Sequence, residues 1–177
     1  MANTTSAPKS LGDEAERVYQ EGDFESAARL YGEAASTFQA QGNALDGAEM
    51  RNNQSVAFLQ GGNAQAALDA VTGTADIFAD ANDLRRQGIA LANEATPLQS
   101  LGRLDEALES YLRAGAVFKQ AGEDQLYAMV MQAVAGIYLR RGKFFEALSA
   151  QRTGLADLKN LSFTQKIMKA LLRLRLW

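Results

Sequence analysis

The chain has 177 residues, with 21 acidic and 18 basic side chains, a formal net charge of −3, and neither cysteine nor histidine. These two absences remove disulfides, thiolate nucleophiles, the usual general base at neutral pH and the commonest zinc ligand. The sequence also has no Walker or Rossmann phosphate-binding loop. We therefore expect no enzyme activity, no cofactor and no metal site, and an acidic chain of this kind does not predict nucleic-acid binding.

No targeting or membrane-spanning signal is evident along the chain. No apolar run reaches the roughly 18 residues that a membrane span needs. Residues 1–9 lack the basic start and the hydrophobic core of a secretory signal. Residues 1–6 are small and polar, and they are predicted to be disordered. These features predict a cytoplasmic protein.

One pattern occurs four times and organises the rest of the chain. In its clearest copy, Gly102 is followed by Leu104, Ala107, Leu108, Tyr111 and Ala114. The glycine recurs at intervals of 40 residues, at Gly22, Gly62, Gly102 and Gly142, and an alanine follows it at the same distance, at Ala27, Ala67, Ala107 and Ala147. A fixed period of this length is typical of stacked helical repeats.

Each period predicts two antiparallel helices, A before the glycine and B after it. Small residues in A, at Ala15, Ser55, Ala95 and Ala135, can face the alanines of B, so that the helices approach closely. Glycine suits the left-handed turn that ends A, and a second turn follows B at Gly42, Asn82 and Gly122. The expected helices are 1A to about residue 20, then 24–40, 44–60, 64–80, 84–100, 104–120, 124–140 and 144–159. Pro97 should kink helix 3A or loosen its last turn.

These residues resemble the tetratricopeptide repeat (TPR) family, in a variant whose period is 40 residues and not the usual 34. The resemblance covers about residues 8–160. It implies an all-α fold, a right-handed α-solenoid of four TPR-like helix-turn-helix repeats, about 7–42, 43–82, 83–122 and 123–160, followed by a C-terminal capping helix. The chain departs from the family pattern where Pro97 lies within a helix A and where Gln151 replaces an aromatic residue of helix B.

The resemblance also implies a function and its location. In the TPR family the A helices line a concave groove that binds an extended or helical segment of another protein. The matching positions here are Glu16, Tyr19, Asn52, Asn53, Val56, Leu59, Ile89, Asn93, Thr96, Met129, Gln132, Gly136 and Arg140. Asn53 and Asn93 are equivalent positions. Their amides can hold the main chain of a bound peptide or bridge neighbouring A helices, and both readings stay open.

The C-terminal segment 161–177 differs from the rest of the chain in charge. All acidic residues lie at or before Asp157, whereas five basic residues and no acidic ones follow it. Ser162 and Gln165 have the spacing of a capping box, which predicts a new helix. Its apolar side carries Phe163, Ile167, Leu171, Leu174 and Trp177, while Leu172 and Leu176 lie off that side. This basic amphipathic helix can cap the solenoid or lie on an anionic membrane surface.

The sequence therefore predicts a non-catalytic module or scaffold that binds a segment of a partner protein in its groove. Two alternatives rest on other features of the same chain. One is a peripheral membrane adaptor anchored by the basic C-terminal helix. The other is a homo-oligomeric scaffold in which the open ends of solenoids stack on each other.

Overall fold

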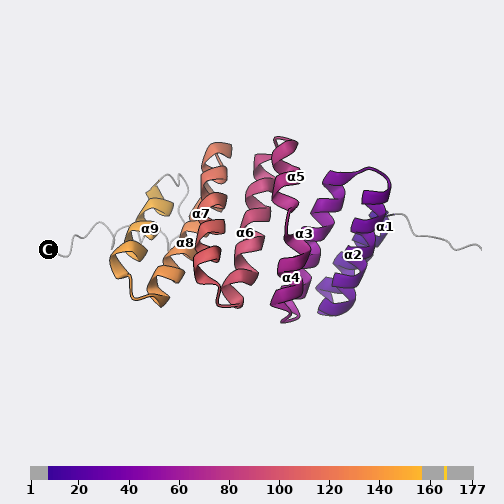
Figure 1. The fold of residues 1–177 in the computed structure, drawn as a ribbon, viewed down its shortest axis with the longest axis horizontal. Helices are drawn as coiled ribbons and strands as arrows, with labels where there is room; N and C mark the ends of the chain where they lie inside the picture. The colour runs from indigo at the N-terminus through magenta and orange to yellow at the C-terminus, as the bar shows by residue number, and fades with distance from the viewer. Residues whose placement is uncertain (1–7, 157–165, 167–177) are drawn as a thin grey trace, which may run out of the picture.

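The computed structural model describes residues 8–156 and Lys166, and all regular secondary structure in this part of the chain is α-helix. The helices are α1 (Pro8–Gln20), α2 (Phe24–Ala40), α3 (Ala44–Gln60), α4 (Ala64–Val71), α5 (Thr74–Asp80), α6 (Leu84–Ser100), α7 (Leu104–Ala121), α8 (Asp124–Arg140) and α9 (Phe144–Ala156). They follow one another from α1 to α9 along the long axis of the molecule, with α4 and α5 one above the other (Figure 1). The predictions for residues 1–6 and for the C-terminal helix fall outside the described residues, apart from Lys166, which is helical and exposed.

The row consists of helical hairpins. The A helices are α1, α3, α6 and α8, and each packs on the B helix of its own repeat, which is α2, α4 with α5, α7 or α9. From the second repeat onward, each A helix also packs on the B helix of the preceding repeat, and α3 touches α6 directly. The predicted all-α solenoid of TPR-like repeats is therefore confirmed.

Small residues bring the two helices of each hairpin together, as the repeat predicts. Ala15, Ser55, Ala95 and Ala135 of the A helices are all at most 3 % exposed, and so are Ala27, Ala67, Ala107 and Ala147 of the B helices. In the third repeat, a Cβ added to Gly88 of α6 would lie 2.5 Å from Cε1 of Phe118 in α7, so this position of the hairpin has no room for a side chain. Larger side chains at these positions would force the helices apart.

The predicted turn residues adopt the backbone conformation that the pattern requires. Positive φ angles occur at Gly22, Gly42, Gly62, Asn82, Gly102, Gly122 and Gly142. In the first two and a half repeats an Asx residue follows the turn and caps the next helix, as when the Asp23 carboxylate accepts the Ser26 N–H at 3.1 Å. Asn43, Asn63 and Asp83 cap α3, α4 and α6 in the same way. Each such pair ends one helix and starts the next within three residues.

Helix 2B differs from its prediction. A single helix was expected at 64–80, but the chain forms α4 and α5, separated by Thr72 and Gly73. Thr72 is extended, with ψ at 128°, and Gly73 is left-handed, with φ at 81°. The Leu68 carbonyl at the end of α4 accepts both the Thr72 N–H at 3.1 Å and the Thr72 hydroxyl at 2.8 Å.

Helix 3A contains the proline at which a kink or a loosened last turn is expected. The helix α6 runs without interruption through Pro97 to Ser100, and the Leu101 N–H donates to the Pro97 carbonyl at 2.9 Å. Pro97 is fully buried. The last turn of α6 therefore forms around a buried proline, although proline cannot donate the usual backbone hydrogen bond.

Candidate groove on the A helices

The A-helix face of the first two repeats contains a pocket of about 440 Å³ between α1, α2 and α3. It is lined by Lys9, Gly12, Asp13, Glu16, Tyr31, Phe38, Asp46, Glu49, Met50 and Asn53. Four of these residues are acidic and one is basic, while Met50 and Phe38 add apolar surface. A wider depression of about 930 Å³ lies along α2, away from the positions that the repeat pattern assigns to the groove.

A tyrosine from the B helix fixes one carboxylate of the pocket. The Tyr31 hydroxyl donates to Glu16 at 2.7 Å, and the Gln20 amide donates to the other oxygen of Glu16, also at 2.7 Å. The hydrogen bonds from Gln20 and Tyr31 lower the pKa of Glu16. The pKa of Tyr31 is raised, first by burial of its hydroxyl and then by its hydrogen bond to the Glu16 carboxylate. The pocket therefore holds an ionised carboxylate in a fixed orientation.

The same geometry recurs two repeats later with a neutral residue. Thr96 stands at the position of Glu16 and Tyr111 at the position of Tyr31, and their hydroxyl oxygens are 3.1 Å apart. Thr96 also donates to the Ala92 carbonyl at 2.9 Å. Burial raises the pKa of Tyr111. In both repeats a tyrosine of the B helix therefore forms a hydrogen bond with the polar side chain at the same position of the A helix.

The two equivalent asparagines of the prediction have different surroundings. Asn93 donates to the Oδ1 atom of Asn52 at 3.2 Å, across the α3–α6 contact, and Asn52 is buried and donates to the Ala48 carbonyl at 3.0 Å. Asn53 instead lines the pocket and is half-buried. One amide therefore bridges two repeats, and the other lines the pocket.

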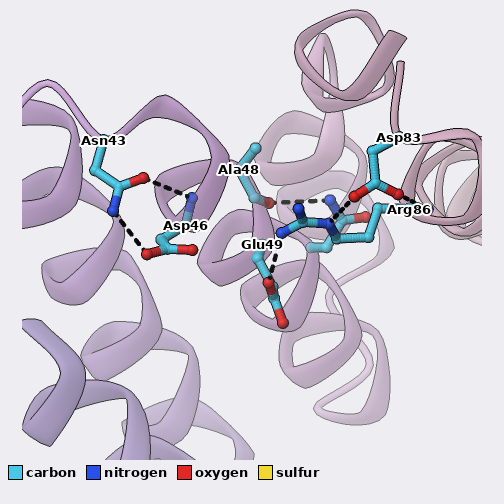
Figure 2. A network of polar contacts seen from close by, with 7 residues as sticks. Asn43, Asp46, Ala48, Glu49, Asp83 and Arg86 are labelled. Atoms are coloured by element: carbon cyan, nitrogen blue, oxygen red, sulfur yellow. Dashed lines mark hydrogen bonds and ion pairs between the residues drawn. The ribbon is translucent and has the colours of Figure 1, made fainter. Parts of the chain in front are cut away.

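An arginine links the second and third repeats beside the pocket (Figure 2). Arg86 Nη1 lies 3.1 Å from Glu49, and Arg86 Nε lies 2.6 Å from Asp83, the residue that caps α6. The hydrogen bond to the Asp83 carboxylate raises the pKa of Arg86, and the negative charges of Asp83 and Glu49 raise it further. In turn, hydrogen bonds from the Arg86 backbone N–H and the Arg86 side chain lower the pKa of Asp83. The guanidinium also lies over the Phe78 ring, 5.1 Å from its centroid. Glu49 is thus partly neutralised, whereas Asp13 remains exposed.

The remaining predicted groove residues are not among those that line the pocket. Tyr19 packs edge-on against Phe24, with ring centroids 5.3 Å apart, at the end of α1. Four others, Val56, Leu59, Ile89 and Gly136, are half-buried. In the last repeat, Met129 is 65 % exposed, and Gln132 and Arg140 are exposed as well. The face therefore changes from an acidic pocket at α1 and α3 to an open surface at α8.

Several pocket residues were absent from the sequence prediction. Lys9 and Glu49 occupy the positions of Ile89 and Met129 in the first two repeats, so the 40-residue register alone would have identified them. Asp46 lies three residues before Glu49 and four before Met50, the spacings that place residues next to each other on a helix, and all three line the pocket. Asp13 is the first-repeat equivalent of Asn53. The prediction had favoured the second to fourth repeats.

The described part of the chain offers neither a metal site nor a membrane span. Within residues 8–156 and Lys166, no group of three or more acidic side chains is arranged so that it could hold a metal ion. Among the helices described, none combines the length and the apolar character needed to cross a bilayer.

Comparison with known proteins agrees with this fold. The chain is similar to the solved TPR-like repeats described as those of a kinesin light chain from Podosopora anserina, with a TM-score of 0.75 and 16 % identity over 95 % of this chain and 87 % of that one. A single-residue variant of those repeats matches equally well, with a TM-score of 0.75 and 16 % identity over 93 % of this chain and 84 % of that one. The protein is thus a TPR-like helical repeat protein. Its residues 11–170 match the family described as soluble NSF attachment protein, SNAP, and the chain belongs to that family. No curated protein sequence matches it closely enough to add to this comparison.

Proposed function

We propose that the protein is a non-catalytic adaptor that binds a segment of a partner protein along the face lined by α1, α3, α6 and α8, called the groove below. The observation that carries this proposal is the pocket between α1, α2 and α3, whose lining includes Glu16 and Asn53, two of the predicted groove residues. Helical repeat proteins of this kind act as interaction scaffolds, because their stacked units present one long binding surface.

The chemistry of the pocket favours a basic segment at this end of the groove. Asp13 and Glu16 are exposed carboxylates, and the side chains of Met50 and Phe38 can contact the aliphatic part of a lysine or arginine. The Asn53 amide adds a donor and an acceptor that suit a peptide main chain. A partner with alternating basic and apolar side chains therefore fits best.

The family description supplies a first partner to test. It names attachment to NSF, so purified NSF is the first protein to titrate against this chain. The variant Asp13→Asn with Asn53→Ala changes only pocket residues. Asp69→Asn, on the exposed surface of α4 outside the pocket, is the matched control.

The experiment also has a partner-independent arm. A library of displayed peptides is selected on the full chain, and the enriched sequences are measured by fluorescence anisotropy. We expect enriched peptides to be basic and to lose roughly tenfold in affinity on the pocket variant, which corresponds to about 1.4 kcal/mol, while the control binds as before. Binding that is equal for all three proteins would place the interaction elsewhere and contradict the proposal.

A further inference from the structure

Arg86 departs from the capping pattern of the A helices, and Figure 2 shows the two successive caps together. In α3, the Asn43 side chain caps the helix and its amide donates to Asp46, three residues on, at 2.6 Å. The equivalent pair in α6 is Asp83 and Arg86, so a basic residue stands in the first turn of that helix. The helix dipole disfavours a cation at this end, and the presence of one therefore indicates a role other than capping.

The guanidinium group of Arg86 joins two repeats, because its nitrogens meet different partners. Its Nε atom lies 2.6 Å from Asp83 in the same helix, whereas its Nη1 atom lies 3.1 Å from Glu49 in the preceding repeat. The group also lies over the Phe78 ring, 5.1 Å from the ring centroid. Asp83 and Phe78 would therefore hold Arg86 in place even if Glu49 turned away.

Glu49 is the more exchangeable of the two carboxylates that Arg86 contacts. Its side chain is 48 % exposed and lines the pocket, whereas the Asp83 side chain is 27 % exposed and also caps α6. Ion pairs exposed to the extent of the Glu49 pair contribute little to stability. Glu49 can therefore turn from Arg86 toward a cation in the pocket at small cost.

Arg86 also distinguishes Glu49 from other carboxylates of the pocket. Glu16 and Asp46 accept hydrogen bonds from neutral side chains, so in these contacts no cation offsets their charge. Glu49 instead faces a guanidinium, while Lys9 is the cation in the pocket lining itself. Removal of the Arg86 charge would therefore make the pocket more negative at one position, next to any ligand that enters it.

We propose that Arg86 is a specificity-determining residue of the groove, which competes with the basic segment of the partner for the Glu49 carboxylate. A basic side chain in the pocket approaches Glu49 from one side while the guanidinium holds it from the other, and the two cations repel each other. Arg86 thereby lowers the affinity for segments that are merely basic and favours those with further contacts in the pocket. The inference rests on the proposed function and adds what limits the binding.

Two neighbouring arginines provide a matched pair of variants for the full chain. Arg86→Met removes the charge but keeps an unbranched side chain next to Phe78. Arg85→Met removes the same charge from the same turn of α6, but Arg85 pairs with Glu123 at 3.0 Å, and neither of these two residues lines the pocket. The probe is octalysine with a fluorescent label at one end, measured by anisotropy at low salt, where exposed charges are screened least.

We expect Arg86→Met to bind octalysine roughly three- to fivefold more tightly than the parent chain, and Arg85→Met to stay within about twofold of it. Addition of Glu49→Gln to Arg86→Met should abolish the gain, because the freed carboxylate is its cause. The proposal is overturned by an Arg86→Met affinity that is unchanged or weaker. An equal gain in Arg85→Met, or a gain that survives Glu49→Gln, overturns it as well.

Arg86→Lys is a second variant, which keeps a positive charge beside Asp83 and so preserves folding if Arg86→Met impairs it. Lysine carries a single nitrogen, so it cannot bind Asp83 and Glu49 through separate atoms as arginine does. Arg86→Lys should therefore show part of the gain in octalysine affinity. Binding equal to that of the parent chain would contradict the competition for Glu49.

Thermal unfolding tests the ion pair without any ligand. Glu49→Gln should lower the melting temperature of the parent chain by about 1–3 °C, and it should have little effect when Arg86→Met is already present. Equal shifts in both backgrounds would mean that the two side chains are not coupled, which overturns the proposal.

The octalysine measurement also separates this inference from the proposed function. Binding that Asp13→Asn with Asn53→Ala leaves unchanged would show that the pocket does not take basic segments, and both proposals would then fail. Binding that depends on these pocket residues but is indifferent to Arg86 would overturn the inference alone.

Discussion

Asn93 of α6 donates a hydrogen bond to the amide oxygen of Asn52 in α3, at 3.2 Å. The acceptor residue is 5 % exposed and belongs to the preceding repeat. This contact assigns different roles to two equivalent positions, because Asn93 bridges repeats whereas Asn53 lines the pocket. It also means that the asparagines of the repeat cannot be replaced together in a binding experiment without a loss of stability.

The first prediction concerns this bridge. Asn93→Ala should lower the free energy of unfolding by about 1–3 kcal/mol, because it leaves the buried Asn52 oxygen without its donor. Asn53→Ala, at the equivalent position one repeat earlier, should change it by less than about 0.5 kcal/mol. Urea denaturation followed by circular dichroism measures both. Equal losses in the two variants would contradict the structural role assigned to Asn93.

The second prediction concerns two glycines in opposite backbone conformations. Gly73→Ala should destabilise the protein by about 1–2 kcal/mol, because φ at this residue is 81°. Gly136→Ala, within α8, should stabilise it by up to about 1 kcal/mol, since a Cβ there would meet no atom within 4 Å and alanine favours the helix. Thermal unfolding of both variants measures these opposite shifts. A rise in melting temperature for Gly73→Ala would mean that α4 and α5 join readily into one helix.

The third prediction concerns pH and Asp83. The Arg86 backbone N–H and then its side chain hold the pKa of Asp83 below its ordinary value of 3.8. The folded-state pKa is therefore the lower one, so the stabilisation is complete above the unfolded-state value and is lost as pH falls through the folded-state value. Between about pH 5 and about pH 2 the parent chain should lose more stability than Asp83→Asn, which keeps an oxygen to cap α6 but carries no charge. Parallel pH profiles of unfolding in the two proteins would show that this carboxylate makes no net contribution.

The fourth prediction concerns the closeness of the helices in a hairpin. Ala107→Phe should destabilise the protein by roughly 1–3 kcal/mol or more, because Ala107 is fully buried between α6 and α7. Leu112→Phe is the matched control on the same helix, since Leu112 is 44 % exposed. Chemical denaturation compares the two. A denaturation curve of Ala107→Phe that coincides with that of the control would mean that the hairpin tolerates a wider separation than the small residues indicate.

The repeat, its helices and its turns could be predicted from the sequence because their causes are local. A glycine such as Gly102 ends a helix through its own backbone freedom, and its φ of 76° needs no distant contact. The alanines that follow at a fixed distance then specify which faces of the hairpin meet, since only small residues permit that approach. The 40-residue period carries this local solution through the whole chain.

The tertiary structure alone decided which glycines interrupt a helix. Gly32, Gly73, Gly115 and Gly154 all lie within predicted B helices, yet only Gly73 has a positive φ. The other three are helical and lie close to a neighbouring helix, as at Gly154, where an added Cβ would be 2.8 Å from Cβ of Met131. Close packing therefore explains these glycines, whereas an added Cβ at Gly73 would meet nothing within 4 Å. The roles of the two equivalent amides also could not be predicted from the sequence. Asn93 contacts the preceding repeat, whereas Asn53 lines a pocket. This difference depends on the distance between helices that are 40 residues apart in the chain.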